Sequence, residues 1–308
     1  ARRQRQMCIR DRTLNKASEA YYNGQGELMT DYEWDAAFDE LKALEDITGI
    51  VLPDSPTAKV SEDDMSGQKE EHEFAALSLA KTKQPQDLAK WAEGREIWLS
   101  WKLDGLTLVV TYDNGRLTKV VTRGNGHIGT NITRLAPAID GILPTIAYKG
   151  HLVIRGEAVI SYKDFEQFLM EQDEDYANPR NLASGSLTLK DVDEVKQRHI
   201  HWIPFTLVYA DDEILSWGER MAFLANQGFD TVEREKIANP TLSNIEACID
   251  HWTQKVTNGS CPYPVDGLVI AYDDTAYAAT GSVTGHHATR AGYAFKWQDE
   301  SVVTKLDH

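Results

Sequence analysis

The sequence predicts an α+β protein: a small N-terminal helical domain, followed by a larger domain of antiparallel sheets flanked by helices. Three observations lead to this fold class. Apolar residues recur at helical spacing up to about residue 48, whereas many later segments alternate between apolar and polar residues. A charged stretch, SEDDMSGQKEE at 61–71, separates the two patterns. Hairpin-like and helical segments are then interspersed, which favours antiparallel sheets over a βαβ array.

The length and composition agree with two globular domains. The 308 residues are 42% hydrophobic and 26% charged, enough to bury a sizeable core. We place the boundary near residue 66, with a helical domain at 13–66 and a second domain at 67–308. No apolar run approaches the roughly 18 residues needed to span a bilayer, so no membrane partner is expected.

The net charge and the cysteines exclude other classes. A formal charge of −16 argues against a surface that lies mostly along a nucleic-acid backbone. The three cysteines (Cys8, Cys248 and Cys261) form no CxxC pair, so they predict neither a zinc site nor a disulfide framework. We therefore expect a protein of the reducing cytoplasm.

The first twelve residues, ARRQRQMCIRDR, are basic and poor in core-forming side chains. MCIRDR resembles a translated sequencing adapter, and a native basic arm is the alternative. We expect residues 1–12 to be non-native and exclude them from the fold.

A helical pair is predicted over residues 13–48. Thr30 and Glu33 have the spacing of a capping box, which predicts that a helix begins there. The apolar face of that helix is formed by Trp34, Phe38, Leu41 and Leu44.

Strands are predicted after the charged stretch. Two alternating runs are joined by DNGR, in which Asn114-Gly115 is a strong hairpin signal. Further strands are predicted in HLVIRGEAVI, WIPFTLVYA, VDGLVIAY and GYAFKW, and helices in YKDFEQFLMEQ, SWGERMAFLANQG and LSNIEACIDHWTQKV.

The segment GNGHIG, from Gly124 to Gly129, has the formal spacing of a dinucleotide-binding loop. That loop functions only inside a parallel βαβ unit. Here it follows the return arm of a predicted hairpin, and Pro137 interrupts the next segment. We reject the dinucleotide-fold interpretation.

Ionisable residues interrupt several predicted strands. An isolated lysine such as Lys102 in WKLDG would most simply extend its amine to solvent. Similar interruptions in separate strands instead predict a charged cleft that is lined from several directions. The residues concerned are Lys102, Asp104, Arg123, Arg155, Glu157, Asp266 and Lys296.

The two signs of charge in this set suit a nucleotide with a divalent cation. The cations at 102, 123 and 296 suit a polyphosphate, and the carboxylates at 104, 157 and 266 suit sugar hydroxyls or a hard metal ion. A second cation about 5 Å from Lys102 would repel it by about 3 kcal/mol, or about two pKa units. Such crowding would free the amine to attack phosphorus.

These segments also carry a resemblance. KLDG, TRGNG, IRGEA, ANPRNLASGSL, VDGLVI and AFKW follow one another as in the NAD-dependent DNA ligases of bacteria. AYYNGQGELMTDYEWDAAFDEL and LPDSPT resemble the small first domain of that family, so the resemblance runs from about residue 18 to 306. It implies an NMN-binding domain followed by an adenylation domain with a nucleotidyltransferase fold.

The resemblance also implies roles for individual residues. Lys102 would take AMP from NAD, with Mg²⁺ assisting, and Asp104 would orient it. Glu157 would bind the ribose and Lys296 the α-phosphate. Further roles are implied for Arg123 at ribose or phosphate, Arg180 with Asn178 near the reacting phosphate, Asp266 in metal-assisted chemistry, and Ser78 and Leu79 over the adenine. No residue is assigned as a protein ligand of a resident metal.

The small domain would hold the nicotinamide half. Asp31, Trp34 and Asp35 share one helical face, where an aromatic ring and carboxylates suit a positively charged nicotinamide. Tyr21 and Tyr22 would complete this pocket. Alternatively, Trp34 simply packs between the two helices.

The sequence departs from the family at several positions. Ser100 stands where glutamate is usual and Ala271 where lysine is usual, and Tyr22 and Trp34 replace a histidine and a tyrosine. An arginine usual upstream of DGLVI is missing from TNGSCPYP. These departures concern the adenine contacts and the efficiency of adenylation.

The family's OB-fold, zinc module and helix-hairpin-helix elements do not follow in this chain. We therefore expect a monomeric fragment that self-adenylates but binds nicked duplex DNA weakly and does not seal it alone. Two alternatives remain open: an ATP- or GTP-dependent ligase or capping-type enzyme, and a non-catalytic NAD-binding module.

Overall fold

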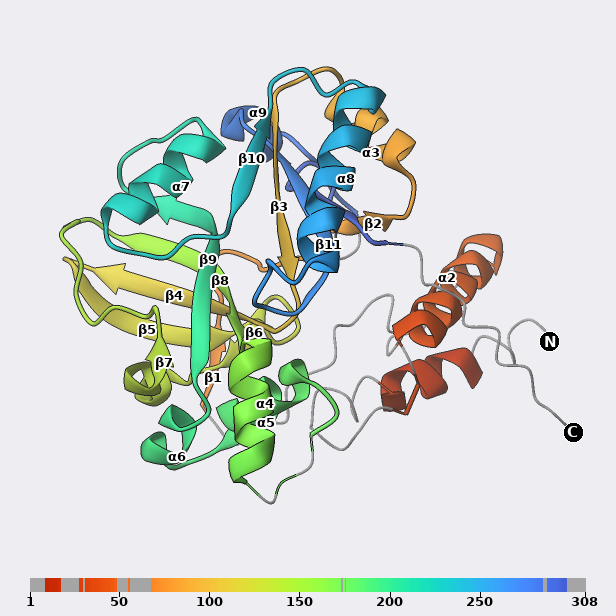
Figure 1. Ribbon diagram of the computed structural model, residues 1–308. Helices are drawn as coiled ribbons and strands as arrows, with labels where there is room; N and C mark the ends of the chain where they lie inside the picture. The colour runs from red at the N-terminus through yellow and green to blue at the C-terminus, as the bar shows by residue number, and fades with distance from the viewer. Residues whose placement is uncertain are drawn as a thin grey trace, which may run out of the picture.

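The computed structural model describes residues 9–17, 28–29, 31–48, 55, 68–172, 174, 176–284 and 287–297 (Figure 1). These residues confirm an α+β fold with helices first and mixed sheets and helices afterwards. Within these ranges, no helix has the length and apolar character that crossing a membrane requires.

The N-terminal part contains the expected helical pair. One helix covers residues 9–17, and α2 covers Asp31–Thr48. Leu14 from the first helix packs with Ala37 and Leu41 from α2, and all three are buried. The first helix is described from residue 9, before the predicted domain start at residue 13, and the domain boundaries stay predictions. The non-native origin of residues 1–12 stays a prediction.

The first sheet has the strand order β10-β3-β11-β14-β2. Its central strands are β3 (Ile97–Leu103) and β11 (Val265–Tyr272), which pair antiparallel. The remaining strands are β10 (Arg234–Ile237), β14 (Tyr293–Phe295) and β2 (Ala80–Thr82). The helices α3 (Pro85–Ala92) and α8 (Leu242–Thr257) contact each other beside this sheet, and α9 (Thr275–Ala279) follows β11.

The second sheet has the strand order β5-β4-β8-β9-β7. The strands are β4 (Leu106–Asp113), β5 (Arg116–Thr122), β7 (Ile139–Asp140), β8 (Leu152–Val159) and β9 (Ile200–Ala210). Around it lie the 3-10 helix η1 (Thr133–Ala138) and the helices α4 (Tyr162–Glu171), α5 (Pro179–Thr188), α6 (Val192–Lys196) and α7 (Trp217–Asn226). Two small strand pairs complete the description: β1 (Lys69–Glu71) with β6 (Ile128–Thr130), and β12 (Val283–Thr284) with β13 (His287–Ala288).

The predicted hairpin is confirmed. β4 and β5 pair antiparallel and are joined at Asn114-Gly115, where both residues have positive φ (50° and 75°). Two positive φ values are typical of the tight turn that matches the twist of paired strands. The GNGHIG segment follows β5 and returns through β6, so the rejection of a dinucleotide-binding fold is confirmed.

The sheets are not purely antiparallel, contrary to the prediction. β2 pairs parallel with β14, and β7 pairs parallel with β9. In each case a short strand from a distant part of the chain closes an edge of the sheet. Local alternation predicts such a strand poorly, and it carries no information about the direction of pairing.

One apolar core spans both large sheets. Leu99 and Trp101 of β3 belong to the same buried cluster as Val110 of β4 and Ile154 of β8, and helix α8 adds Trp252. The charged residues of the predicted cleft are therefore attached to a single packed scaffold.

Candidate active site

The KLDG motif lies where the chain passes from the first sheet to the second. β3 ends at Leu103 and β4 begins at Leu106, so Asp104-Gly105 forms the link between the sheets. A Cβ at Gly105 would lie 2.1 Å from the carbonyl oxygen of Ala158 on β8, so only glycine allows this close approach. The motif therefore places Lys102 at the junction between the two sheets.

Asp266 joins the two lysines of the site. Its Oδ1 and Oδ2 atoms lie 2.6 and 2.7 Å from the Nζ of Lys102, and Oδ2 lies 3.5 Å from the Nζ of Lys296. Asp266 lies at a register shift between Val265 and Gly267, where β11 faces β3. An irregularity of this kind redirects a side chain without ending the strand pairing.

The two lysines keep Asp266 ionised. Burial alone would raise the pKa of Asp266, but the ammonium groups of Lys102 and Lys296 outweigh burial and hold it below its ordinary value. A carboxylate in this state accepts hydrogen bonds, and it is a weaker base than a free aspartate as long as both lysines are charged.

The prediction that neighbouring cations crowd Lys102 did not include a carboxylate beside it. A carboxylate lies between Lys102 and Lys296 and contacts both. Asp266 is therefore the direct counter-ion of Lys102.

Asp104 contacts an arginine instead of the lysine that it was expected to orient. The Arg180 guanidinium lies 2.6 Å from its Oδ1. Arg180 is in the first turn of α5, which Pro179 begins and the Asn178 side chain caps by accepting from the Asn181 backbone N–H. ANPRN is thus the start of a helix that brings an arginine to the KLDG link.

Glu157 lies on the second sheet at the same junction. Thr107 of β4 donates a hydrogen bond of 2.9 Å to its Oε2. Burial raises the pKa of Glu157 to about 7, although the positive charges of Arg180, Arg123 and Lys102 act in the opposite direction. Those charges place Glu157 within electrostatic range of Lys102, so charged residues of both sheets lie near one another at the junction, and the cleft itself stays a prediction.

The remaining site residues fall into two groups. Arg123 follows β5, and its backbone N–H donates to the Thr107 carbonyl oxygen at 3.0 Å. Ser78 and Leu79 immediately precede β2, which pairs with the strand that leads to Lys296. Asp31, Trp34 and Asp35 lie in α2, but their side chains are outside the described residues, as are Tyr21 and Tyr22 entirely.

Sequence analysis missed Thr107 and His72. Thr107 carries a hydroxyl group in the otherwise apolar run GLTLVV, and this polar interruption could have marked it as a site residue. His72 Nε2 donates to the Arg123 carbonyl oxygen at 2.9 Å. No spacing in the sequence connects residues 72 and 123.

Comparison with known families agrees with this geometry. Residues 66–300 match the model of the NAD-dependent DNA ligase adenylation domain. Residues 1–61 match the model of the DNA ligase-like, N-terminal NAD+-binding domain.

The chain belongs to the NAD-dependent DNA ligase family.

Relatives of this ligase chain span the same two regions. It is 40% identical over 299 residues to a DNA ligase of Lachnoclostridium phytofermentans, covering 95% of this chain and 45% of the relative. It is 41% identical over 299 residues to a DNA ligase of Ruminiclostridium cellulolyticum, with the same coverage. The ligase chain thus spans about half the length of the curated relatives that it matches.

Solved ligase structures are more distant. A mycobacterial DNA ligase D complexed with ATP and MES has a TM-score of 0.43 at 16% identity, over 72% of this chain and 60% of that one. A putative ATP-dependent DNA ligase from Aquifex aeolicus has a TM-score of 0.45 at 11% identity, over 78% and 56%.

The described residues of the candidate site do not by themselves form a metal cage. Among the described residues, no group of three or more histidine, cysteine, aspartate or glutamate side chains could hold a metal ion. Asp104 and Asp266 are paired with cationic side chains. Magnesium commonly keeps several waters and binds substrate phosphates, so it stays a prediction for the nucleotide-bound protein.

Proposed function

We propose that this chain transfers AMP from NAD to Lys102. The Nζ atom forms a bond to the α-phosphorus, the bond from that phosphorus to the bridging oxygen breaks, and nicotinamide mononucleotide leaves with the electron pair. The Lys102 ammonium gives one proton to Asp266 to become the attacking amine, and it loses a second proton, to solvent, as the nitrogen–phosphorus bond forms. The observation that carries this proposal is the shared contact of Asp266 with Lys102 and Lys296 at the junction of two sheets.

Asp266 is placed to receive the first of these protons. It already accepts hydrogen bonds from Lys102 through both oxygens, and its lowered pKa keeps it ionised before the reaction. Lys296 compensates the negative charge of Asp266 and presents a cation to the α-phosphate. A charged side chain that is already in place needs little reorganisation during the transfer.

The rest of the cleft would hold the nucleotide. Glu157 would accept a hydrogen bond from a ribose hydroxyl, with its own carboxyl positioned by Thr107. Arg123 and Arg180 would face phosphate oxygens, and Ser78 and Leu79 the adenine. The nicotinamide half would lie against the N-terminal helices, with Tyr21, Tyr22, Asp31, Trp34 and Asp35 as its proposed contacts.

In a longer enzyme, self-adenylation would be the first step in sealing a 3′-hydroxyl to a 5′-phosphate in nicked duplex DNA. The net charge of −16 supports weak DNA binding by this chain, because an acidic surface repels the phosphate backbone. We further propose that the chain is monomeric, acts in the cytoplasm and uses Mg²⁺ with the nucleotide.

Intact-protein mass spectrometry tests the proposal. The purified chain is incubated with NAD or ATP, with and without Mg²⁺, and Lys102→Ala serves as the matched control. An added AMP with NAD, absent in the variant, is the expected result. An adduct with ATP alone would support the ATP-dependent alternative, and no adduct with either nucleotide would support a non-catalytic binding module.

A further inference from the structure

A short segment connects the outer face of the second sheet to the edge of the first. We call residues 72–79 the connecting segment. It follows β1 and ends where β2 begins. Its backbone N–H groups at His72 and Ala76 donate to the carbonyl oxygens of His127 and Gly126, each at 2.7 Å. The GNGHIG loop is thus a docking site for this segment.

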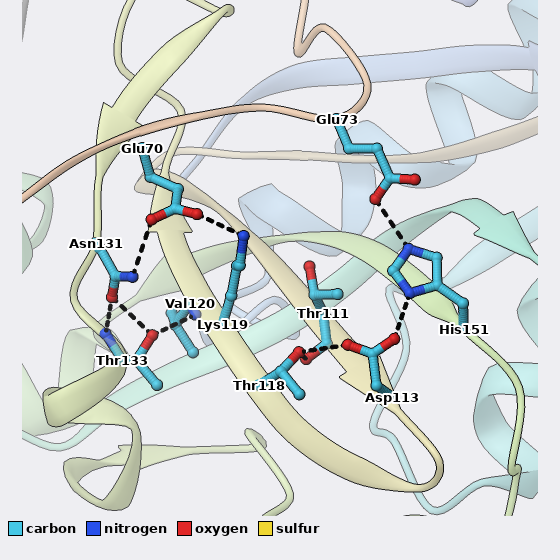
Figure 2. A network of polar contacts seen from close by, with 10 residues as sticks. All are labelled: Glu70, Glu73, Thr111, Asp113, Thr118, Lys119, Val120, Asn131, Thr133 and His151. Carbon is cyan, nitrogen blue, oxygen red and sulfur yellow. Dashed lines mark hydrogen bonds and ion pairs between the residues drawn. The ribbon is translucent and has the colours of Figure 1, made fainter.

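Polar contacts hold the entry to the connecting segment (Figure 2). The Glu70 carboxylate pairs with Lys119 and accepts from Asn131. The His151 imidazole lies between two carboxylates, 2.6 Å from Asp113 and 2.9 Å from Glu73. These contacts attach the start of the segment to the β4–β5 hairpin and to the start of β8.

Arg155 holds the middle of the segment. It lies on β8 on the same face as Glu157, since alternate strand residues share a face. Its guanidinium donates to the carbonyl oxygens of Ala75 at 2.6 Å and Phe74 at 3.3 Å. Phe74 packs on the apolar cluster of Ala76, Val109 and Val153.

The guanidinium of Arg155 is unusual because its charge is not neutralised nearby. Its Nε atom is buried without a hydrogen-bond partner, and no carboxylate among the described residues pairs with it. Burial lowers the pKa of Arg155 to about 10, so it remains charged at neutral pH. Burying an unpaired cation is costly, and two carbonyl contacts alone compensate only part of that cost.

The first residue of the segment contacts Arg123 of the proposed nucleotide site, and its last residue, Leu79, is itself part of that site. His72 donates to the Arg123 carbonyl oxygen at 2.9 Å. Leu79 packs over Gly292, where an added Cβ would come within 3.2 Å of its side chain. The Lys296 backbone N–H donates to the carbonyl oxygen of Thr82, in the strand that continues the segment, at 2.9 Å.

We propose that Arg155 is a positioning residue for the nucleotide, acting through the connecting segment. By fixing the carbonyl groups of Phe74 and Ala75, it sets the path of the chain that reaches Ser78 and Leu79 at the adenine side of the cleft. This inference rests on the proposed function. Both hydrogen bonds come from Nη2, whose two hydrogens are held in the plane of the guanidinium, whereas the amine of a lysine rotates freely and fixes no such direction.

The test compares Arg155→Met and Arg155→Lys with Arg220→Met. Arg220 is the matched control because it also donates to two backbone carbonyl oxygens, those of Ile214 and Leu207, but on α7 and away from the cleft. For each variant, thermal stability is measured, together with the apparent Kd for NAD and the maximal rate of lysyl-AMP formation in single-turnover experiments.

Arg155→Met is expected to raise the apparent Kd for NAD about tenfold, while the maximal rate stays within about twofold of wild type. Arg155→Lys is expected to give a smaller rise in the same direction. Arg220→Met is expected to lower thermal stability without changing either parameter. A change in the Kd for NAD without a change in the maximal rate distinguishes a positioning role from a general loss of stability.

Two outcomes would overturn the inference. One is that Arg155→Met, or Arg155→Lys if the first variant does not fold, loses stability like Arg220→Met but keeps the wild-type Kd. The other is a loss confined to the maximal rate. If the wild-type chain itself forms no lysyl-AMP, the proposed function fails instead, and AMP binding measured by calorimetry on the same variants still decides the role of Arg155.

Discussion

The carboxylate of Asp266 receives both of its shortest contacts from one amine, at 2.6 and 2.7 Å from the Nζ of Lys102. The nucleophile proposed for adenylation is therefore already hydrogen-bonded to a group that can take its proton. This relationship, more than the lysine alone, distinguishes the site from a surface lysine on a strand.

Asp266→Asn is expected to slow lysyl-AMP formation by about 100-fold or more, since positioned proton transfer commonly contributes that factor. The amide keeps the shape of the side chain but neither neutralises Lys102 nor accepts its proton. Single-turnover mass spectrometry with NAD measures the rate. Asp250→Asn, at an exposed position of α8, is the control and should react like wild type. A wild-type rate in Asp266→Asn would remove Asp266 from the mechanism.

The raised pKa of Glu157 should make the free energy of unfolding depend on pH. Burial raises its pKa from 4.5 to about 7, so the folded protein favours the protonated carboxyl. The resulting stabilisation is full below pH 4.5 and is lost as the pH rises through about 7. Between pH 5 and pH 8, wild type should lose more unfolding free energy than Glu157→Gln, by at most about 3 kcal/mol.

Urea denaturation at the two pH values measures this difference. Glu166→Gln, at an exposed position of α4, is the matched control and should follow wild type. Equal pH slopes for wild type and Glu157→Gln would show that Glu157 is ionised throughout this range.

Gly105→Ala is expected to destabilise the protein by about 2 kcal/mol or more, because the added Cβ would lie 2.1 Å from a backbone oxygen. The link between the sheets must then shift, so NAD-dependent adenylation should fall as well. Gly94→Ala is the comparison, since it adds strain at a φ of +72° but meets no atom within 4 Å. That variant should cost about 1 kcal/mol and leave the adenylation rate unchanged. Similar losses in both variants would contradict a steric role for residue 105.

The ion pair between Asp104 and Arg180 should make the effects of substituting these two residues on stability interdependent. A double-mutant cycle with Asp104→Asn and Arg180→Gln should give a coupling of about 1 kcal/mol in unfolding free energy, because both side chains are largely shielded from solvent. The pair of Lys236 and Glu96 is more exposed, with 40% and 49% of the side chains accessible. It should give less than about 0.5 kcal/mol in the same measurement. Equal coupling in the two cycles would mean that burial adds nothing to the first pair.

Much of the fold could be predicted from local patterns. The hairpin at Asn114-Gly115 followed from turn chemistry, and β8, β9, β11 and β14 from apolar runs. The helix α5 was not predicted, because PRNLASGSLT is rich in small polar residues and has little helical periodicity. The edge strands β2, β7 and β10 were missed for a related reason: they are short, and distant partners determine them.

The sequence indicated which residues would lie together at the site, but not which of them would contact one another. Charges in separate apolar strands indicated that Lys102, Glu157, Asp266 and Lys296 would share a cleft, and the structure brings them together. The sequence could not show that Asp104 faces Arg180, because α5 was not predicted. Nor could it show that Asp266 lies between the lysines, since that depends on a local irregularity in β11. The chemical roles of these residues stay predictions.

The apolar cluster shared by the two large sheets has a consequence for cooperativity. Leu99 and Ile154 come from the two different sheets but belong to the same buried cluster. Neither sheet is expected to unfold while the other stays folded. Both sheets should therefore denature in one transition, with loss of nucleotide binding and loss of secondary structure at the same midpoint. The relative positions of the reactive groups therefore depend on the stability of the whole folded region and not only on the packing next to Lys102.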